Sequence, residues 1–305
     1  GNVIIFKGAT PGYENEPAII IQGHTDMVTV CEPESGIDMT KDPLSLVFDG
    51  EYLSADKTSL GGDDGIAVAY ALAILDSDTI KHPAIEAVFT VNEEVGMDGA
   101  LGIDLSMLKS SRLMNIDSEE EGVLLTSCAG GIRVQSKFSV GKRHTSGNFM
   151  QISISGLKGG HSGTEIHRPL LNANIAMRRM LSGIENIRIC EWNGGILDNI
   201  IPTSATASIL CDAADVDAIS KQIRDICEQI KAEYPEENGI VLQISQKQMQ
   251  NAQAATVSET SKILAFLNEI PNGVMQTDET LHMPKTSLNL GILTFSDGVL
   301  HLDTL

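Results

Sequence analysis

Two kinds of apolar segment alternate along the first half of this 305-residue chain. Residues 18–21 and 84–91 are short, continuous apolar runs typical of buried strands, whereas residues 65–75 have the length and composition of a helix. A further strand is expected at 112–116. Alternating strands and helices predict an α/β fold with a mainly parallel sheet covered on both faces and a ligand site at the carboxyl ends of its strands.

A second unit is expected after residues 141–147, because this polar, glycine-bearing stretch is typical of a linker. The elements that follow are predicted as a strand (149–156), a helix (171–182), two strands (186–192 and 205–211), a helix (214–232) and a strand (239–245). This order matches the ferredoxin-like α+β unit. The second helix places apolar side chains three and four positions apart, at Val216, Ile219, Ile223, Cys227 and Ile230, so that one stripe packs on a sheet.

The last 50 residues are expected to open a further lobe. A helix is predicted at 258–270, and strands at 287–294 and 299–302 flank a turn. The chain does not begin with Met, its first residues already read as a strand, and its last strand looks cut short. These features predict a fragment truncated at both ends.

The charge balance excludes two classes of partner. Asp and Glu number 41 against 21 Lys and Arg, which gives a net charge of −20 that repels phosphate backbones and anionic lipids. We therefore expect no nucleic acid and no membrane partner. No apolar run approaches the roughly 20 residues that span a bilayer, and five scattered cysteines suggest neither a disulfide framework nor a zinc knuckle. A cytoplasmic location fits these features best.

Acidic or histidine clusters fall where predicted strands end or a helix begins. They contain His24, Asp63, Glu94 and Asp117. The carboxyl ends of parallel strands converge on one rim, so these four side chains could meet around a cation. Carboxylates with an imidazole suit zinc, manganese or cobalt, and a bridging carboxylate would let two ions sit close together.

Each of these residues also has a structural interpretation. His24 alone is more often a hydrogen-bonded histidine at a strand end, although Asp26 two residues on is placed to orient a ligand. Asp63 and Asp64, taken alone, are better explained as helix N-terminal caps. Glu93 and Glu94 could form a solvated loop pair, but they follow a strand apolar enough to be central, and charges there need partners. The glutamates at 119–121 are interpreted as a solvated acidic turn.

Two segments of the second unit have weaker signals. The glycine-rich stretch 156–163 does not supply the Walker pattern, and alone it predicts a flexible turn from which His161 could reach across a cleft. The segments 193–195 and 198–202, which include Asn199, are interpreted as turns.

Taken together, these motifs resemble the bacterial aminoacyl-histidine dipeptidases, which share a co-catalytic metallopeptidase superfamily with the carnosinases, tripeptidases and aminoacylases. The order, spacing and flanks of the matching segments agree over essentially the whole chain. The segments are 22–28, 58–66, 92–97, 115–122, 128–131, 159–163 and 286–291.

The resemblance implies two divalent ions, with zinc expected first and manganese or cobalt as alternatives. His24, Asp63 and Asp117 would hold one ion, and Asp63 and Glu94 the other. Glu93 would be the general base that takes a proton from the metal-bound water, and Asp26 would orient His24. His161 would steady the oxyanion, and Asn199 would contact the substrate carboxylate.

The resemblance also implies a zinc-peptidase-like catalytic domain with an inserted ferredoxin-like lid. Residues 1–140 would be the N-terminal part of the catalytic domain, and 141–305 the lid with the start of a second lobe. The family's catalytic domain resumes after its lid and supplies a further histidine that neither His282 nor His301 matches in context. The fragment itself is therefore expected to have weak or no activity.

The implied function is hydrolysis of dipeptides, of the Xaa-His or carnosine-like kind. A tripeptidase or aminoacylase of the same superfamily is the alternative enzyme, and a non-catalytic binding or assembly module is the alternative from another class. A small peptide substrate and, by analogy, a homodimer through the lid are the expected partners.

Overall fold

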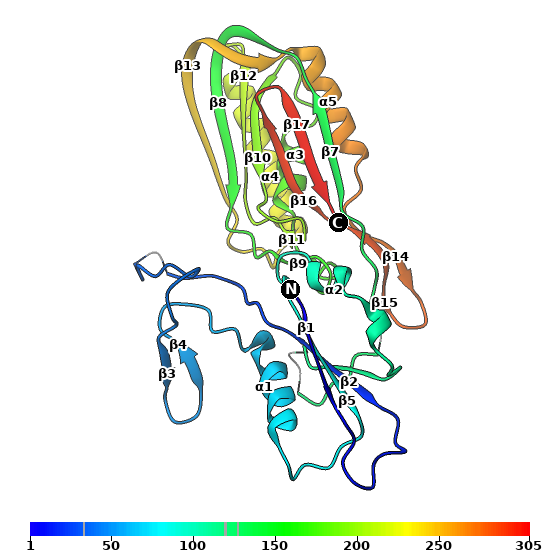
Figure 1. Cartoon of the computed structure of the whole chain (residues 1–305). Coiled ribbons are helices and arrows are strands. Elements are labelled where there is room, and N and C mark those ends of the chain that lie inside the picture. Colours follow the sequence, from blue (N-terminus) through cyan, green and yellow to red (C-terminus); the bar gives the residue numbers. More distant parts are fainter. Residues whose placement is uncertain (33, 119–120, 127) are drawn as a thin grey trace. The chain divides into compact units, whose positions relative to one another are not determined.

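The computed structural model describes residues 1–305 except 33, 119–120 and 127, and it does not describe the side chain of residue 250. The acidic turn expected at 119–121 therefore lies largely outside the described residues. The chain divides into two compact units, Gly1–Cys128 and Ala129–Leu305. The elements of each unit are labelled in Figure 1.

The first unit is built on a four-stranded sheet in the order β1-β5-β2-β6. Strands β2 (Ile19–His24), β5 (Ile85–Thr90) and β6 (Leu113–Asn115) run parallel, and β1 (Val3–Lys7) is antiparallel to β5. All six residues of β5 are buried. This matches the continuous apolar run in the sequence, which is the pattern of a central parallel strand.

Helix α1 (Gly62–Asp76) covers one face of this sheet. Its Ala71 packs with Ile21, Ala87 and Phe89, which lie on alternate positions of β2 and β5. Gly23 is needed at the crossing, because a Cβ there would lie 2.5 Å from Ala67 Cβ. The helix therefore sits directly on the end of β2.

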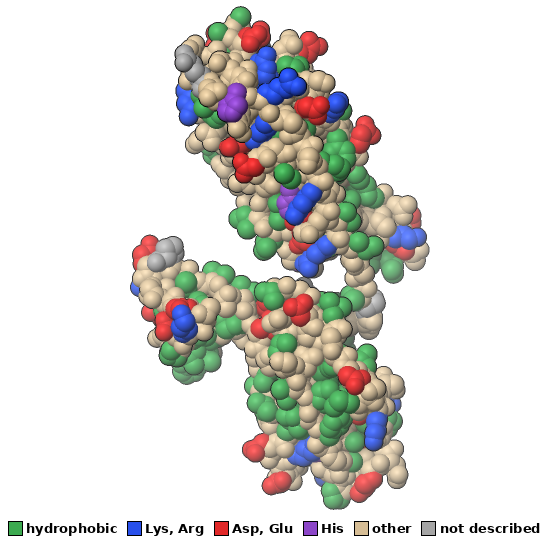
Figure 2. Space-filling view, turned by 45° about the horizontal axis from the view of Figure 1, so that its top comes forward, with side chains coloured by type: hydrophobic (Ala, Val, Ile, Leu, Met, Phe, Trp, Pro, Cys, Tyr) green, Lys and Arg blue, Asp and Glu red, His purple; other side chains and the backbone are tan. Residues whose placement is uncertain are grey.

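The remaining elements of the first unit are short. Strands β3 (Leu46–Phe48) and β4 (Leu53–Ala55) form a hairpin, and α2 (Asp98–Gly102) and the 3-10 turn η1 (Leu105–Met107) follow β5. Neither hairpin strand was predicted from the sequence. Many apolar side chains of this unit are exposed, and Figure 2 shows them spread over its surface in green.

The second unit contains a seven-stranded sheet in the order β13-β8-β12-β10-β16-β17-β7. Its first four strands are β13 (Val241–Ala255), β8 (Lys142–Ser155), β12 (Ala205–Cys211) and β10 (Arg188–Gly194). They are joined by antiparallel pairs, with β8 and β12 in the centre. This is the predicted ferredoxin-like unit, with a helix after its first and third strands.

Helices α3 (Ala173–Leu181), α4 (Val216–Glu233) and α5 (Val257–Glu269) contribute side chains to one core with this sheet. The predicted stripe of α4 is buried at Ile219, Ile223, Cys227 and Ile230. Trp192 of β10 lies in the same core.

Two expectations for this unit were wrong. Residues 142–147 are not a linker, because they form the first half of β8 and pair with the end of β13. Strands β16 (Leu290–Ser296) and β17 (Val299–Thr304) do not open a further lobe. They form the predicted hairpin, but β16 pairs with β10 and β17 with β7 (Val134–Ser139), so both extend the same sheet.

Two small strand pairs complete the second unit. Strand β9 (Gly160–His161) pairs with β11 (Ile200–Ile201), and β14 (Gly273–Asp278) pairs with β15 (Met283–Leu288). No helix in the described part of the chain is long and apolar enough to cross a bilayer.

Candidate metal centre

The ends of three parallel strands in the first unit bring together the acidic residues singled out in the sequence. Strand β2 ends at His24, β5 is followed by Glu93 and Glu94, and β6 is followed by Asp117. Asp63 joins them from the start of α1. Residues up to 93 positions apart in the chain therefore share one rim.

The imidazole of His24 lies at the centre of this cluster and is only 1% exposed. Its Nε2 is 2.9 Å from Asp63 Oδ1 and 3.9 Å from both Glu93 Oε2 and Asp117 Oδ1. Two sets of side chains offer ligand atoms that all lie within 4.8 Å of one another. These sets are His24, Asp63 and Glu94, and His24, Asp64 and Asp117.

The start of α1 determines where its two aspartates point. Gly61 has φ +78°, a left-handed conformation, and a Cβ there would lie 2.9 Å from Met27 Cβ. Asp63 and Asp64 are joined by a cis peptide bond and have non-helical backbone angles. The N-cap residue is Gly61 rather than either aspartate. The carboxylate of Asp64 nevertheless accepts a hydrogen bond from the backbone N–H of Ala67 in the first turn, which favours its charged form.

Asp64 is a residue that sequence reasoning passed over. It is 1% exposed, and its Oδ2 accepts a hydrogen bond of 3.2 Å from the backbone N–H of His24. Its Oδ1 is buried without a hydrogen-bond partner. The adjacent acidic pair at 63–64 was the available signal, but an aspartate doublet before a helix is equally typical of a cap.

Asp26 connects His24 to the two glutamates. Its backbone carbonyl lies 2.8 Å from His24 Nδ1, within hydrogen-bond distance, and its carboxylate accepts hydrogen bonds of 3.1 Å from the backbone N–H groups of Glu93 and Glu94. These amide hydrogen bonds lower the pKa of Asp26 against the opposing effect of burial. One residue thus orients the imidazole and the loop that carries both glutamates.

The cluster has an excess of negative charge. Burial raises the pKa of Glu93, Glu94 and Asp117, and neighbouring carboxylates add to the effect, above all that of Asp63 on Glu94 and Asp117. Burial, together with Asp117, raises the pKa of Asp64 to about 6. The pKa of His24 is raised because hydrogen bonding to Asp63 and Asp26, with the charges of Asp117 and Glu93, outweighs burial.

The donor set fits divalent cations. Crowded carboxylates with raised pKa values are stabilised when a cation replaces the protons. The buried Oδ1 of Asp64, which has no hydrogen-bond partner, would also be stabilised by a nearby cation. Oxygen ligands with one imidazole suit zinc, manganese or cobalt.

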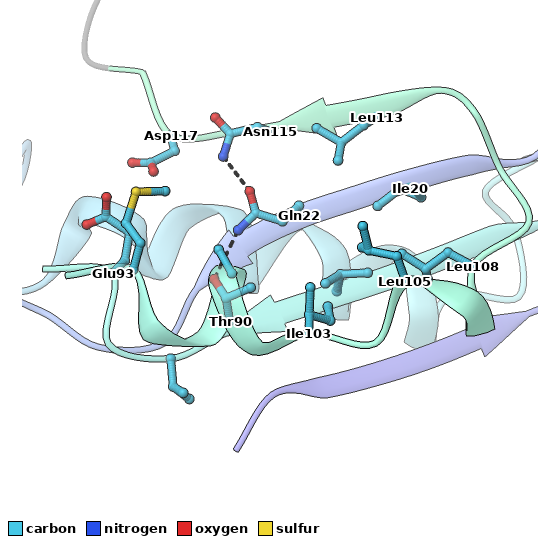
Figure 3. A pocket seen from close by; sticks show the side chains of 14 residues that line it. Ile20, Gln22, Thr90, Glu93, Ile103, Leu105, Leu108, Leu113, Asn115 and Asp117 are labelled. Carbon is cyan, nitrogen blue, oxygen red and sulfur yellow. Dashed lines mark hydrogen bonds between the residues drawn. The ribbon is translucent and has the colours of Figure 1, made fainter. Parts of the chain in front are cut away.

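A cavity of about 240 Å³ adjoins the cluster on the sheet face opposite α1. Glu93 and Asp117 stand at one end, and apolar side chains from the sheet, α2 and η1 line the other (Figure 3). Between the two ends, Gln22 donates to Thr90 Oγ1 at 3.1 Å and accepts from Asn115 at 2.6 Å. The apolar wall keeps water away from one side of Glu93, consistent with its raised pKa.

His161 and Asn199, the two other predicted site residues, belong to the second unit. They lie near each other there, because β9 and β11 pair His161 with Ile200, the neighbour of Asn199. The rim in the first unit is therefore made by the other six predicted residues, which are His24, Asp26, Asp63, Glu93, Glu94 and Asp117.

The chain has the α/β fold of the M20 peptidases. Residues 152–237 match the model of the peptidase dimerisation domain. The match covers most of the ferredoxin-like part of the second unit.

Two comparisons confirm the resemblance to aminoacyl-histidine dipeptidases. The chain is 38% identical to the cytosol non-specific dipeptidase of Escherichia coli (strain K12) over 98% of its length. It matches the crystal structure of aminoacylhistidine dipeptidase from Vibrio alginolyticus with a TM-score of 0.78 and 36% identity over 99% of its length. The chain spans 63% of the length of each of these relatives. A shorter match, 32% identity over 35% of the chain, is to the uncharacterized protein YqjE of Bacillus subtilis (strain 168).

Proposed function

We propose that this chain carries the metal-binding and general-base residues of a dipeptidase that uses two divalent cations. The carrying observation is the convergence of His24, Asp63, Glu93, Glu94 and Asp117 on one rim. His24, Asp63 and Asp117 would hold one cation, and Asp63 and Glu94 the other. Zinc is the first candidate. When bound, the cations would lower the pKa of a water and polarise the peptide carbonyl.

Glu93 is the proposed general base. Its carboxyl lies on the rim at 3.9 Å from His24 Nε2 and is one-third exposed, so it reaches both the ligand cluster and solvent. The raised pKa of Glu93 favours this role, because a carboxylate with a higher pKa is a stronger base and accepts a proton more readily. Glu93 would take the proton of the attacking water and return it to the leaving amine.

The remaining roles follow from the same scheme. Asp26 holds His24 in the orientation that presents Nε2 to a cation. His161 would donate to the oxyanion of the tetrahedral intermediate, and Asn199 would bind the substrate carboxylate. The first unit, up to Cys128, would form part of the catalytic domain, and the second unit, from Ala129, would form a lid, since β7 already belongs to the sheet of the second unit and the boundary expected at 140 lies too late.

The similarity to the two named dipeptidases supports dipeptides, including Xaa-His peptides, as substrates. The match to the peptidase dimerisation domain supports a homodimer formed through the second unit. The name of the Escherichia coli relative supports a cytosolic location. A net charge of −20 argues against nucleic acid and anionic membranes as partners.

Metal stoichiometry of the purified chain at neutral pH, after equilibration with zinc or manganese, tests the proposal. We expect two bound ions and their joint loss in Asp63→Ala, because this carboxylate would bridge them. Glu51→Gln is the matched control, since Glu51 is an exposed carboxylate of the same unit outside the cluster. A chain that binds no divalent ion would contradict the proposal.

Glu93→Gln, made in a protein extended past Leu305 because weak or no activity is expected from residues 1–305 alone, separates an enzyme from a binding module. The substitution keeps the size of the side chain and removes the base, so hydrolysis of a dipeptide should be lost while metal binding is kept. A variant with undiminished hydrolysis would exclude Glu93 as the base. A panel of dipeptides, tripeptides and N-acyl amino acids then separates a dipeptidase from the related tripeptidases and aminoacylases.

A further inference from the structure

Two segments of the second unit meet at the β9–β11 ladder. In this ladder His161 pairs with Ile200, and Gly160 pairs with Ile201. The backbone N–H of Ser162 donates to the carbonyl of Asn199 at 2.8 Å. Backbone hydrogen bonds therefore fix the distance between the segments that carry His161 and Asn199.

Asn289 holds the segment of Asn199 from the other side. It stands between β15 and β16 and is 1% exposed. Its Nδ2 donates to the carbonyl of Asp198 at 2.8 Å and to that of Ile200 at 2.9 Å. These carbonyls flank Asn199 in the chain, so one amide group brackets it.

The side chain of Asn289 is itself fixed in orientation. Its Oδ1 accepts a hydrogen bond of 3.2 Å from Nδ2 of Asn172, which is 2% exposed. Both amide protons and the amide oxygen of Asn289 are thus engaged in a buried environment, where leaving any of them unpaired would be costly.

Gly291 lets the bracketed segment lie directly on β16. A Cβ at Gly291 would meet the Cα of Asp198 at 2.4 Å and its carbonyl oxygen at 2.5 Å. These are backbone atoms, which cannot move aside as a flexible side chain would. The motif at 286–291 therefore supplies both the amide and the space that seat Asn199.

Glu237 acts in the same way on the segment of His161. It is 3% exposed, and its carboxylate accepts from the backbone N–H of Lys158 at 2.8 Å and from that of Leu171 at 3.1 Å. Both ends of the 158–171 segment are thereby tied to one carboxylate. Within it, Glu165 accepts a hydrogen bond of 3.0 Å from the backbone N–H of His161.

We propose that Asn289 and Glu237 are positioning residues: Asn289 holds Asn199 in place for the substrate carboxylate, and Glu237 holds His161 in place for the oxyanion. This inference rests on the proposed function, in which Asn199 and His161 contact substrate. Preorganised donors are effective because no conformational free energy is lost in orienting them during binding.

We call the contacts of Asn289 with the carbonyls of Asp198 and Ile200 the Asn289 bracket. Hydrogen exchange of the Ser162 amide, measured on the folded chain, tests this bracket without requiring activity. Asn289→Ala should accelerate its exchange at least tenfold, and Asn289→Asp should do the same because a carboxylate cannot donate to two carbonyls. Gly291→Ala should reproduce the effect by displacing residue 198.

Ile223→Ala in α4 is the matched control, because it removes buried atoms from the core of the same unit on an element that carries neither segment. Compared at an equal loss of Tm, it should leave the Ser162 amide slow. Native-like exchange in Asn289→Ala, or equal acceleration in Ile223→Ala, would overturn the bracket.

Kinetics with a dipeptide and its C-terminal amide test whether Asn289 and Glu237 position Asn199 and His161 for the substrate. Asn289→Ala should raise KM for the dipeptide about tenfold and change KM for the amide much less, because the amide lacks the carboxylate. Glu237→Gln, which loses one acceptor oxygen, should lower kcat about tenfold with little change in KM.

Equal effects on both peptides, or the same pattern in Ile223→Ala, would reduce both residues to structural ones and overturn the proposal. These kinetics are measured on a protein extended past Leu305, because weak or no hydrolysis is expected from residues 1–305 alone. If that extended protein hydrolyses neither peptide, the result contradicts the proposed function and overturns the substrate role of Asn289 and Glu237 with it. The exchange result on Ser162 would still decide whether the bracket exists.

Discussion

The backbone carbonyl of Asp26 lies 2.8 Å from Nδ1 of His24, while the carboxylate of Asp26 is engaged elsewhere, by the amides of Glu93 and Glu94. The carboxylate oxygen Oδ1 of Asp26 itself is 3.6 Å from Nδ1 of His24. Asp26 therefore positions His24 with its main chain and the glutamate loop with its side chain. Removing the carboxylate should affect the glutamates first.

Asp26→Ala should weaken zinc or manganese binding by about 10- to 100-fold, the range typical of losing a residue that orients metal ligands. The loop of Glu93 and Glu94 would lose two charge-assisted hydrogen bonds, whereas the carbonyl that faces His24 would remain. Competition with a chromophoric chelator gives the affinity.

Asp38→Asn provides the comparison for that measurement. Asp38 is an aspartate of the same unit that accepts backbone and side-chain hydrogen bonds in an exposed turn. Its substitution should leave the metal affinity unchanged. Equal affinities for Asp26→Ala and the unaltered chain would mean that the glutamates bind no metal or need no support.

Gly23→Ala should disturb the rim through the helix contact. The new Cβ would lie 2.5 Å from Ala67 Cβ and 2.7 Å from Asp64 Oδ2, so α1 and the buried carboxylate must move together. We expect a loss of about 1–3 kcal/mol in the free energy of unfolding and weaker metal binding.

Gly65→Ala in α1 is the matched substitution, because nothing lies within 4 Å of a Cβ there. It should be neutral or stabilise the helix by up to about 1 kcal/mol. Urea unfolding of both variants, followed by circular dichroism, measures the difference. A Gly23→Ala variant as stable as Gly65→Ala would show that the helix does not pack as closely as described.

The strand and helix pattern predicted most of the sheets because buried strands such as β5 are continuous apolar runs and α4 has a regular stripe. The hairpin of β3 and β4 was not predicted, because its residues are largely exposed and give no burial pattern. The linker prediction at 141–147 failed because polar residues can form a strand when a long partner, here β13, supplies the hydrogen bonds.

The position of the candidate site was easier to predict than its details. Parallel strands impose convergence of their carboxyl ends, so His24 and Asp117 could be grouped from sequence. The side chain of Asp64 could not be assigned to this group from the sequence. Its burial depends on Gly23, which lets helix α1 pack close to β2. The role of Asn289 was equally hidden, since its acceptors lie about 90 residues away in the chain.

Lys7 provides a test of how the first unit is held together. Its Nζ donates to three carbonyls at the end of α1, those of Ile74 at 3.0 Å, Leu75 at 2.9 Å and Ser77 at 2.7 Å. The last turn of this helix has no basic residue of its own. Lys7→Met should therefore destabilise the unit by about 1–3 kcal/mol, seen as faster hydrogen exchange of the α1 amides.

The second unit gives an internal reference for that experiment. The chain has a single tryptophan, Trp192, which is 2% exposed in the core of that unit, so its fluorescence should report an unchanged transition. Lys41→Met removes an exposed lysine paired with Asp38 and should change neither signal. Unchanged exchange in α1 for Lys7→Met would show that the three carbonyls are satisfied by water.

The five cysteines should divide into two reactive and three protected thiols. Cys31 and Cys128 are exposed, whereas Cys190, Cys211 and Cys227 are buried. Burial raises the pKa of Cys211 and Cys227, and raises the pKa of Cys190 to about 11. The thiolate is the reactive form, so at pH 8 Cys190 has on the order of one part in a thousand available, in addition to being shielded.

Ellman's reagent at pH 8 should therefore detect two fast thiols in the native chain and all five after denaturation. The double variant Cys31→Ser, Cys128→Ser should have no fast phase. Raising the pH from 7 to 9 should leave Cys190 unreactive, because its pKa stays above this range while the fold is intact. A third fast thiol would mean that the core of the second unit opens under native conditions.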